Sequence, residues 1–445
     1  MLFGKVGRGI RSCPPAMSPP TTLKPPSKVL IPLRQHRGED CQAAVEPDQT
    51  VLMGQVVGSC AKGGAAPVHA SVSGKVAGLV ETHDPAGGKV QAVVIENDGR
   101  DAWAEAGQGA LAPVADAAEI AQAPPEKLLE AIYSLGLVRA AQTALPLHLE
   151  LAPSEAAAKA SVDTLIINAV DVDPPVAPNQ SLLLKDPDPE MELGIAALAR
   201  ILKDPRVILV LPEGQAGAGL EGLARNRKWE TRRIKADRFP YAMDNLIIHS
   251  LTGRVVPTPQ GLPGDVGVAI MPLLTALEAG QALKSGRPAV ERVFSVCGDV
   301  KNPQTFRVRL GTPLSQVIEA AGGFNGEPGK VVLNGPMMGL AQFDLGAPVS
   351  KETYGIFVQA AQHVAAFKNH PCIHCGRCLK ACPVYLIPAE LSKFCEYGAF
   401  EQAAEKDLFH CIECGCCAYV CPAKRPMVQL LQFGKSEVLA KRMES

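Results

Sequence analysis

Two cysteine motifs near the C-terminus constrain this chain more than any other feature of its 445 residues. Both have the pattern C-x2-C-x2-C-x3-C-P, in which proline follows the last cysteine. Such spacing is typical of [4Fe–4S] proteins, because three thiolates on a tight turn converge on one face of a cubane. We therefore expect two [4Fe–4S] clusters. The first motif contains Cys372, Cys375, Cys378 and Cys382, and the second contains Cys411, Cys414, Cys417 and Cys421.

The fourth cysteine of each motif is expected to bind the cluster of the other motif. It begins the helix after the turn and points away from its own three partners. Two structural zinc sites are the alternative, since C-x2-C pairs also bind zinc. Two identical motifs that both end in proline favour iron–sulfur clusters. One cluster is then expected to take Cys372, Cys375, Cys378 and Cys421, and the other Cys411, Cys414, Cys417 and Cys382.

The remaining six cysteines show no ligand spacing. Buried cysteine is common as a small hydrophobic residue, which is the expected role of Cys13, Cys41, Cys60, Cys297 and Cys395. Cys416 lies beside a predicted ligand but breaks the spacing, so we expect it near a cluster without binding iron. Fourteen cysteines without a secretory signal indicate a reducing compartment and metal ligands rather than disulfides.

Composition excludes two classes of function. The 44 Lys and Arg residues are balanced by 45 Asp and Glu residues, for a net charge of −1. A nucleic-acid-binding chain needs an excess of positive charge to neutralise phosphates, so no nucleic-acid partner is expected. No run of 18 apolar residues is present, so we expect no bilayer-spanning helix.

The pattern along the chain predicts a multidomain α/β protein. Short β-runs broken by Gly and Pro predict a small barrel or sandwich. Within it, Ala66–Val76 resembles a half-repeat of lipoyl-type barrel-sandwich domains, without an evident hairpin-tip lysine for a lipoyl or biotinyl group. Alternating apolar strands and Ala- and Leu-rich helices then predict a Rossmann-like α/β domain with a parallel sheet. A unit that resembles a β-grasp domain of the soluble-ligand-binding type follows, and a helical ferredoxin-like two-cluster domain ends the chain. The expected bounds are 1–28 for a flexible N-terminal arm, 29–100, 125–290, 291–347 and 360–445.

Several segments in order along the chain are very similar to the peripheral C subunit of Rnf-type electron transport complexes. They are IPLRQHRGEDC, APVHASVSGKV, VIENDG, LTGRVVP, GLPGDVGV, LNGPMMG and the two cysteine motifs with their flanks. The resemblance covers nearly the whole chain. It implies two [4Fe–4S] clusters, a middle domain that binds FMN and NAD(H), and a peripheral position on the cytoplasmic side of the inner membrane. It also implies partners among the other subunits of a membrane complex, with ferredoxin or another iron–sulfur protein as a further candidate.

The middle domain departs from the family where flavin chemistry is expected. The family's glycine-rich loop, G-x-G-G-A-G-F-P-T, corresponds here to Gly136–Leu151. A glycine-rich turn lets a flavin or phosphate reach backbone N–H groups because it removes Cβ atoms. Glu150 stands where the family has lysine and would repel a phosphate, whereas Arg139 could bind one in a rearranged loop. The positions that have lost glycine are Arg139, Ala141, Gln142 and Ala144.

Two further flavin-site signatures are altered. The family's N-G-x-E-C-E-P-Y reads NAVDVDPP at Asn168–Pro175, which leaves Asp171 and Asp173 as its acidic residues. The asparagine of the family's N-V-G-T is Pro272 here. The glycines of Glu213–Gly219 form only a weak nucleotide signal. We therefore expect that this chain binds no FMN and that its own catalytic site is lost.

The sequence supports three hypotheses. The first is an iron–sulfur electron-transfer subunit of an Rnf-like complex, which leaves open whether the chain alone is an enzyme. The alternative is an FMN-containing, NAD(H)-reactive subunit, and the third is a middle domain that serves only for docking. Basic residues near the C-terminus could meet an acidic ferredoxin or anionic lipid, or could simply form a solvated helix face. They are Lys424, Arg425, Lys435, Lys441 and Arg442.

Overall fold

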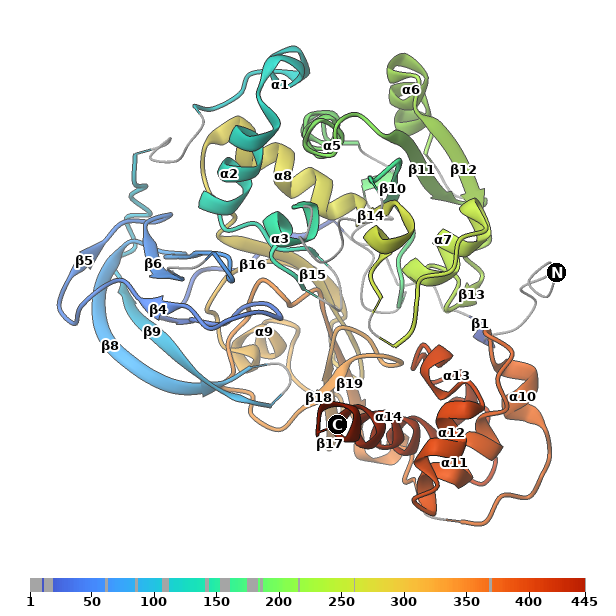
Figure 1. Ribbon diagram of the computed structural model, residues 1–445. Coiled ribbons are helices and arrows are strands. Elements are labelled where there is room, and N and C mark those ends of the chain that lie inside the picture. Colours follow the sequence, from blue (N-terminus) through green and yellow to red (C-terminus); the bar gives the residue numbers. More distant parts are fainter. Residues whose placement is uncertain are drawn as a thin grey trace.

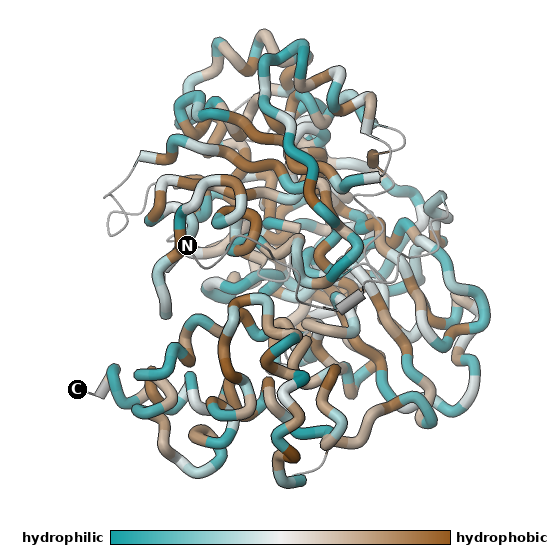
Figure 2. The backbone as a smooth tube through the Cα atoms, turned by 90° about the vertical axis from the view of Figure 1, so that its right-hand side faces the viewer, coloured by the Kyte–Doolittle hydropathy of each residue, from teal (hydrophilic) through white to brown (hydrophobic). Residues whose placement is uncertain are grey.

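The chain forms four units in a computed structural model (Figure 1). No helix among the residues that it describes is long and apolar enough to cross a membrane. Figure 2 shows hydrophobic stretches running through the interior and hydrophilic stretches along the periphery. The structure describes residues 10–11, 19–60, 63–84, 87–105, 112–140, 144–152, 161–173, 183–184, 187–214, 217–259, 261–367 and 370–444.

The first unit is a β structure of two sheets, as the short β-runs predict. Buried and exposed residues alternate along much of β9, because one face of its sheet packs on the core. Gly74 allows a close approach here, since a Cβ at this residue would lie 1.8 Å from the Glu96 oxygen. The sheets have the orders β3-β9-β8-β5 and β4-β6-β7. Their strands are β3 (Lys28–Pro32), β4 (Gln42–Ala43), β5 (Thr50–Val51), β6 (Val56–Ser59), β7 (Val68–His69), β8 (Gly74–His83) and β9 (Lys89–Asn97).

The middle unit contains a four-stranded parallel sheet of order β12-β11-β10-β14. Strands β10, β11 and β14 are apolar and buried because helices cover both faces of the sheet. Leu165 and Ile167 face a core shared with α5 and α8, and Ile166 faces the core shared with α7. The strands are β10 (Thr164–Asn168), β11 (Arg206–Pro212), β12 (Glu230–Ile234) and β14 (Val268–Pro272), with β13 (Arg238–Phe239) outside the sheet. The helices are α1 (Ala117–Gln122), α2 (Pro125–Ser134), α3 (Leu147–Leu151), α5 (Glu190–Ile201), α6 (Ala218–Arg227), α7 (Asp244–Thr252), η1 (Pro263–Val266) and α8 (Leu273–Ser285).

The third unit is a six-stranded mixed sheet that packs against α9 (Leu314–Ala320). Its order is β18-β17-β19-β15-β16-β2. The strands are β15 (Glu291–Gly298), β16 (Gln304–Arg309), β17 (Pro328–Leu333), β18 (Leu340–Gln342), β19 (Gly355–Ala360) and β2 (Thr21–Thr22), and η2 (Ala361–His363) follows β19.

Two short strands lie within the segment 1–28, for which the sequence predicts a flexible arm. Strand β2 pairs in parallel with Phe306–Arg307 of β16. Strand β1 (Ile10–Arg11) pairs antiparallel with β13. A strand of two residues is too short to show an alternation of apolar and polar residues. The sequence of the Pro-rich segment therefore did not indicate these strands.

The fourth unit holds the cysteine motifs and is helical (Figure 1). Its apolar interior lies between α11, α12 and α14 and includes Leu391, Ala403 and Leu431. Each cysteine turn leads into a short helix, and a proline two or three residues beyond that helix's end prevents its continuation. The elements are α10 (Arg377–Ala381), α11 (Pro388–Glu396), α12 (Phe400–Glu405), η3 (Leu408–His410), α13 (Cys416–Tyr419) and α14 (Met427–Glu444).

Candidate functional site

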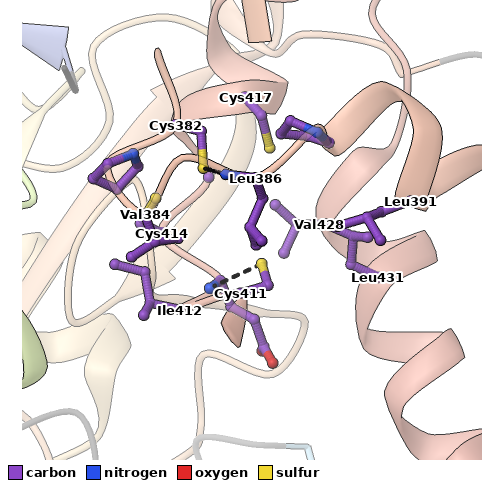
Figure 3. Close-up of a pocket in the computed structure, with 14 residues that line it drawn as sticks. Cys382, Val384, Leu386, Leu391, Cys411, Ile412, Cys414, Cys417, Val428 and Leu431 are labelled. Carbon is purple, nitrogen blue, oxygen red and sulfur yellow. Dashed lines mark hydrogen bonds between the residues drawn. The ribbon is translucent and has the colours of Figure 1, made fainter. Parts of the chain in front are cut away.

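A cavity in the helical unit brings cysteines of both motifs together. Figure 3 shows the four sulfur-bearing side chains around this space, with Leu386 and Val428 also at its border. Cys382 comes from the first motif, where it follows the end of α10. The other three are Cys411, Cys414 and Cys417 of the second motif.

The two cysteine turns have the same backbone conformation. His374 and Glu413, each two residues after the first cysteine, have φ of 55°. Gly376 and Gly415, two residues further on, have φ of 71° and 77°. This left-handed pair curls the backbone so that its N–H groups turn towards sulfur. The N–H groups of His374 and Glu413 each donate to the first sulfur of their own motif, over 3.4 Å.

The cavity is apolar apart from its cysteines and Glu413, whose carboxylate is paired with Lys435 at 2.6 Å. Desolvation raises the pKa of the Cys411 thiol to about 11. The Leu386 N–H donates to the Cys382 sulfur over 3.3 Å. Hydrogen bonds to cluster-ligating sulfurs raise the reduction potential, and exclusion of water favours the less charged state. The donor set and the N–H groups therefore fit a [4Fe–4S] cluster.

The other predicted ligand set lies closer to the surface. Cys378 and Cys421 belong to one buried cluster with Ala418 and Met427. Cys372 is partly exposed and Cys375 is exposed. Helices α10 and α13, which follow the two turns, are in contact. The fourth cysteine of the second motif is thus brought to the third cysteine of the first.

No three His, Cys, Asp or Glu side chains in the described part of the chain are placed to hold a single metal ion. A zinc site requires its thiolates to converge at about 2.3 Å on one ion. A cubane has no such requirement, because each thiolate binds a different iron.

Cys416 is buried beside the second motif. Its thiol donates towards the Phe239 oxygen of β13 over 3.8 Å, and its hydrogen bond with Cys414 lowers the pKa of the Cys414 thiol. Phe239 and Met337 pack against Cys414 and Cys416 in one apolar cluster. The second turn is therefore covered by the middle and third units.

The flavin-like segment contains a buried ion-pair network. The Arg139 side chain is 5 % exposed, and its Nη1 lies 2.7 Å from Oε1 of Glu150. Its Nη2 donates to the Asp244 carboxylate at the start of α7. Burial raises the pKa of the Glu150 carboxyl, while the Arg139 charge opposes that shift. Arg139 and Glu150 therefore neutralise each other instead of offering charge to a phosphate.

Neighbouring positions of this segment are also engaged. The Ala140 N–H donates to Thr275 Oγ1 over 2.9 Å, and Ala144 is buried against Ala66 and Val138. Ala141 and Gln142 lie outside the described residues. At the described positions of this segment, the Ala140 N–H and the space around Ala144 are therefore occupied by contacts within the protein.

The altered acidic signature has a structural role. Asp173 accepts the Met337 N–H over 2.9 Å, and burial raises its pKa to about 6. Asp171 is also buried. Pro272 ends β14 and pairs with Asn168 in the sheet. Asp173 thus joins the middle unit to the loop that carries Met337 in the third unit. Pro174 and Pro175 lie outside the described residues.

Lys351 and Asp244 are the residues that sequence reasoning missed. Lys351 is fully buried where three units meet, and its Nζ donates to the oxygens of Pro67 (3.1 Å) and Gly136 (2.6 Å). Desolvation lowers its pKa to about 7. His69 is buried nearby, with its pKa lowered to about 3 mainly by desolvation. Only their distant partners distinguish these residues, so no local pattern could have found them.

Other residues considered in the sequence have ordinary surroundings. His370, His374 and His410 are exposed. Glu213–Gly219 leads into α6, although Gln215 and Ala216 lie outside the described residues.

Four family models match the chain in order. They are the RnfC barrel sandwich hybrid domain (residues 16–100), the Nuo51 FMN-binding domain (132–279), the SLBB domain (293–341) and the 4Fe–4S dicluster domain (371–424). The chain is therefore a mixed α/β multidomain protein with a barrel-sandwich domain, a Nuo51-type domain and an iron–sulfur domain. The match of residues 132–279 to an FMN-binding domain favours flavin binding, whereas the Arg139–Glu150 ion pair in the flavin-like segment argues against it.

Curated relatives match along nearly the full length. The C subunit of the proton-translocating ferredoxin:NAD+ oxidoreductase complex of Clostridium ljungdahlii is 34 % identical over 93 % of this chain and 88 % of its own. The Na+-translocating counterpart of Acetobacterium woodii is 32 % identical over 94 % and 93 %. Among solved structures, an NAD+-reducing [NiFe]-hydrogenase chain is 17 % identical, with a TM-score of 0.47 over 74 % of this chain and 69 % of its own. The full-length relatives and the order of the domains show that the chain belongs to the RnfC family, the C subunits of ion-translocating oxidoreductase complexes.

Proposed function

We propose that this protein is the iron–sulfur electron-transfer subunit of an Rnf-type, ion-translocating oxidoreductase complex. The observation that carries the proposal is the cavity where Cys382 of the first motif meets Cys411, Cys414 and Cys417 of the second. A [4Fe–4S] cluster supplies one-electron redox chemistry when bound. The relatives named above are C subunits of such complexes, which supports the assignment.

Two clusters are proposed, with ligands crossed between the motifs. The apolar wall of the cavity would keep water from the inner cluster, and the N–H groups of Leu386 and Glu413 would stabilise its charge. The proposed ligands of the inner cluster are Cys382, Cys411, Cys414 and Cys417. Those of the outer cluster are Cys372, Cys375, Cys378 and Cys421.

The other domains serve as a scaffold in this proposal. The middle unit, about 125–290, is Rossmann-like, and the third unit, about 291–347, is a β-grasp domain of the soluble-ligand-binding type. The remaining proposed bounds are 29–100 for the barrel-sandwich domain and 360–445 for the two-cluster domain. We place the protein peripherally on the cytoplasmic side of the inner membrane, held by other subunits of its complex.

The middle unit binds no FMN in this proposal. Arg139, Glu150 and Asp244 form a closed ion-pair network where the family loop has glycines and a lysine. The second candidate function is an FMN-containing subunit that reacts with NAD(H). The match of residues 132–279 to the Nuo51 FMN-binding domain favours it.

Cofactor analysis of the anaerobically purified full chain separates the two candidates. We expect about eight irons and eight sulfides per chain, no acid-extractable flavin, and a [4Fe–4S] EPR signal after reduction. Stoichiometric zinc without iron would overturn the iron–sulfur assignment. Stoichiometric FMN together with iron would establish the second candidate.

Washing membranes tests the proposed location. High salt or mild detergent should release the chain, alone or in a small subcomplex. Retention in the bilayer without any partner subunit would contradict the peripheral assignment.

A further inference from the structure

A buried carboxyl group without a counter-charge lies near the second cysteine turn. It belongs to Asp173, which follows β10 and is 2 % exposed. No Lys, Arg or His in the described part of the chain pairs with it; the carboxylate accepts the N–H groups of Met337, over 2.9 Å, and of Met338. Burial of an unpaired carboxylate costs free energy. A small change in the charge nearby is therefore enough to change the protonation of this group.

The residue that binds Asp173 also covers the proposed inner cluster. Met337 packs with Cys414 and Cys416 in one apolar cluster of side chains. Its carbonyl oxygen would lie 3.2 Å from a Cβ at Gly415, and its Cε 3.4 Å from the same point. A single residue thus separates the Asp173 carboxyl group from the turn that carries Cys414.

The material between the two sites is apolar. Met337, Met338 and Phe239 all pack around the second cysteine turn. The segment Asn334–Gln342, which carries the two methionines, contains no ionisable side chain. Charges interact more strongly where water is excluded, because the local dielectric constant is low. A negative charge added at the inner cluster should therefore act on Asp173.

The other titratable groups around these sites are less suited to exchange a proton. Desolvation, together with the Asp173 charge, raises the pKa of the Cys297 thiol of β15 to about 12, so this thiol stays neutral. Glu413 is already paired with a lysine. Asp171, buried on the loop after β10, and His410, half-exposed beside the second turn, are the remaining alternatives.

We propose that Asp173 takes up a proton when the inner cluster is reduced. One electron enters the cluster from a one-electron donor, and one proton from water converts the Asp173 carboxylate into the carboxylic acid. The added negative charge is balanced in this way, and no bond between heavy atoms forms or breaks. The direction follows from electrostatics, because a nearby negative charge favours the protonated carboxyl. The inference rests on the proposed iron–sulfur function.

An EPR-monitored redox titration of the anaerobically purified full chain, from about pH 5 to about pH 8, tests this proposal. The signal of the inner cluster is the one that Cys382→Ser removes. Because burial places the pKa of Asp173 at about 6, the reduced fraction at a fixed potential should fall as the pH rises through this value. The expected fall is about threefold to tenfold in total. A tenfold change corresponds to about 59 mV for one electron.

Two variants separate proton uptake from a purely structural role of Asp173. Asp173→Asn still accepts the Met337 N–H but cannot ionise, so its potential should stay near the low-pH value of the wild type at every pH. Loss of packing alone would shift the potential equally across the pH range. The matched control Asp163→Asn removes a carboxylate that pairs with Arg254 in the same unit, and it should keep the wild-type profile.

Infrared difference spectroscopy gives a second readout that needs no variant. Reduction of the wild type should produce the C=O stretch of a carboxylic acid and remove that of a carboxylate. Asp173→Asn should lack both changes. If reduction of the cluster-loaded wild type produced no carboxylic acid band, the proposal would be overturned.

The remaining outcomes distinguish this proposal from the function on which it rests. If Asp173→Asn kept the wild-type pH profile while Asp171→Asn or His410→Gln abolished it, another residue would take up the proton and the proposal would be wrong. A wild-type potential that does not change with pH would also overturn it, and would leave the iron–sulfur function intact. Iron content is measured for every variant, and a wild-type chain without a reducible cluster would overturn the proposed function itself.

Discussion

The cysteine unit and the middle unit both match cofactor-binding families. The cysteine unit keeps the residues typical of its family's site, whereas the middle unit has replaced them. The cysteine unit keeps all eight sulfurs in family spacing, and the structure brings Cys382 to three cysteines of the second motif and Cys421 to Cys378 of the first. The middle unit keeps a parallel sheet with helices on both faces. Its flavin-like loop, however, holds Arg139 and Glu150 as a buried pair.

The difference follows from how each cofactor is held. A cluster is bound through side chains, so its site survives only while those side chains remain. A flavin loop depends on missing side chains and free N–H groups, so any added side chain can close it without harming the fold. In the proposed function, the family match of the middle unit therefore reports its scaffold and not a working flavin site.

The largest expected effect tests the crossover between the cysteine motifs. Cys382→Ser should remove the inner cluster, whose other proposed ligands lie about 30 residues downstream, and leave about four irons per chain. Iron analysis and EPR measure this loss. Cys395→Ser is the matched control, because Cys395 is buried in the same unit and proposed to bind no iron.

A cluster assembled from Cys372, Cys375, Cys378 and Cys382 would contradict the crossover. In that case, Cys382→Ser would abolish the outer signal and spare the one that depends on Cys411.

A smaller effect is expected from opening the ion-pair network of the middle unit. Arg139→Ala leaves the carboxylates of Glu150 and Asp244 without a counter-charge, and should lower the free energy of unfolding by about 3–5 kcal/mol. Denaturant unfolding followed by circular dichroism measures it. The partly exposed i,i+4 pair Arg200–Asp204 provides the control. Arg200→Ala should cost about 1 kcal/mol, because it removes this pair and the donation from Nε to the Ala123 oxygen.

If both variants lost the same small amount of unfolding free energy, the buried network would stabilise the fold no more than a surface ion pair does. Recovery of flavin binding by Arg139→Ala alone would show that this one side chain closes the site.

The smallest effect concerns the link between the middle and third units. The pKa of Asp173 is raised to about 6 by burial, so its stabilising contribution is complete below about pH 4 and lost as the pH rises through 6. Asp173→Asn still accepts the Met337 N–H and has no charge to bury. Relative to this variant, the wild type should lose about 2–3 kcal/mol between pH 4 and pH 7.

Thermal unfolding of both proteins across this range measures the difference. Asp163→Asn is the control of opposite sign. Its hydrogen bonds from Arg254 and Thr164 lower the pKa of the carboxyl, so its contribution should be lost only as the pH falls below the ordinary range. A pH-independent gap between the wild type and Asp173→Asn would show that Asp173 is hydrated.

Local sequence was sufficient for the parts of the molecule that depend on local spacing. The two cysteine motifs, the order of the units and the family resemblance are all readable along the chain, and the full-length relatives confirm the family. Strand and helix patterns predicted a parallel sheet in the middle unit, and this is confirmed. The altered glycines also flagged the flavin-like loop as unusual.

Local sequence patterns did not predict ion pairs between residues that are far apart along the chain. Sequence alone treated Glu150 as a group that repels phosphate and Arg139 as one that could bind it, whereas the fold pairs them with each other and with Asp244, 105 residues from Arg139. It also pointed to the C-terminal basic residues, of which the fold pairs Arg425 with Glu396 and Lys435 with Glu413.

The sequence by itself determined which cofactor chemistry the chain can carry, because ligand identity and spacing are local properties. Only the tertiary structure decided which charges cancel and which cysteine turn lies at the surface. Burial and ion pairing depend on what packs against a residue from elsewhere in the chain, and no local pattern records that.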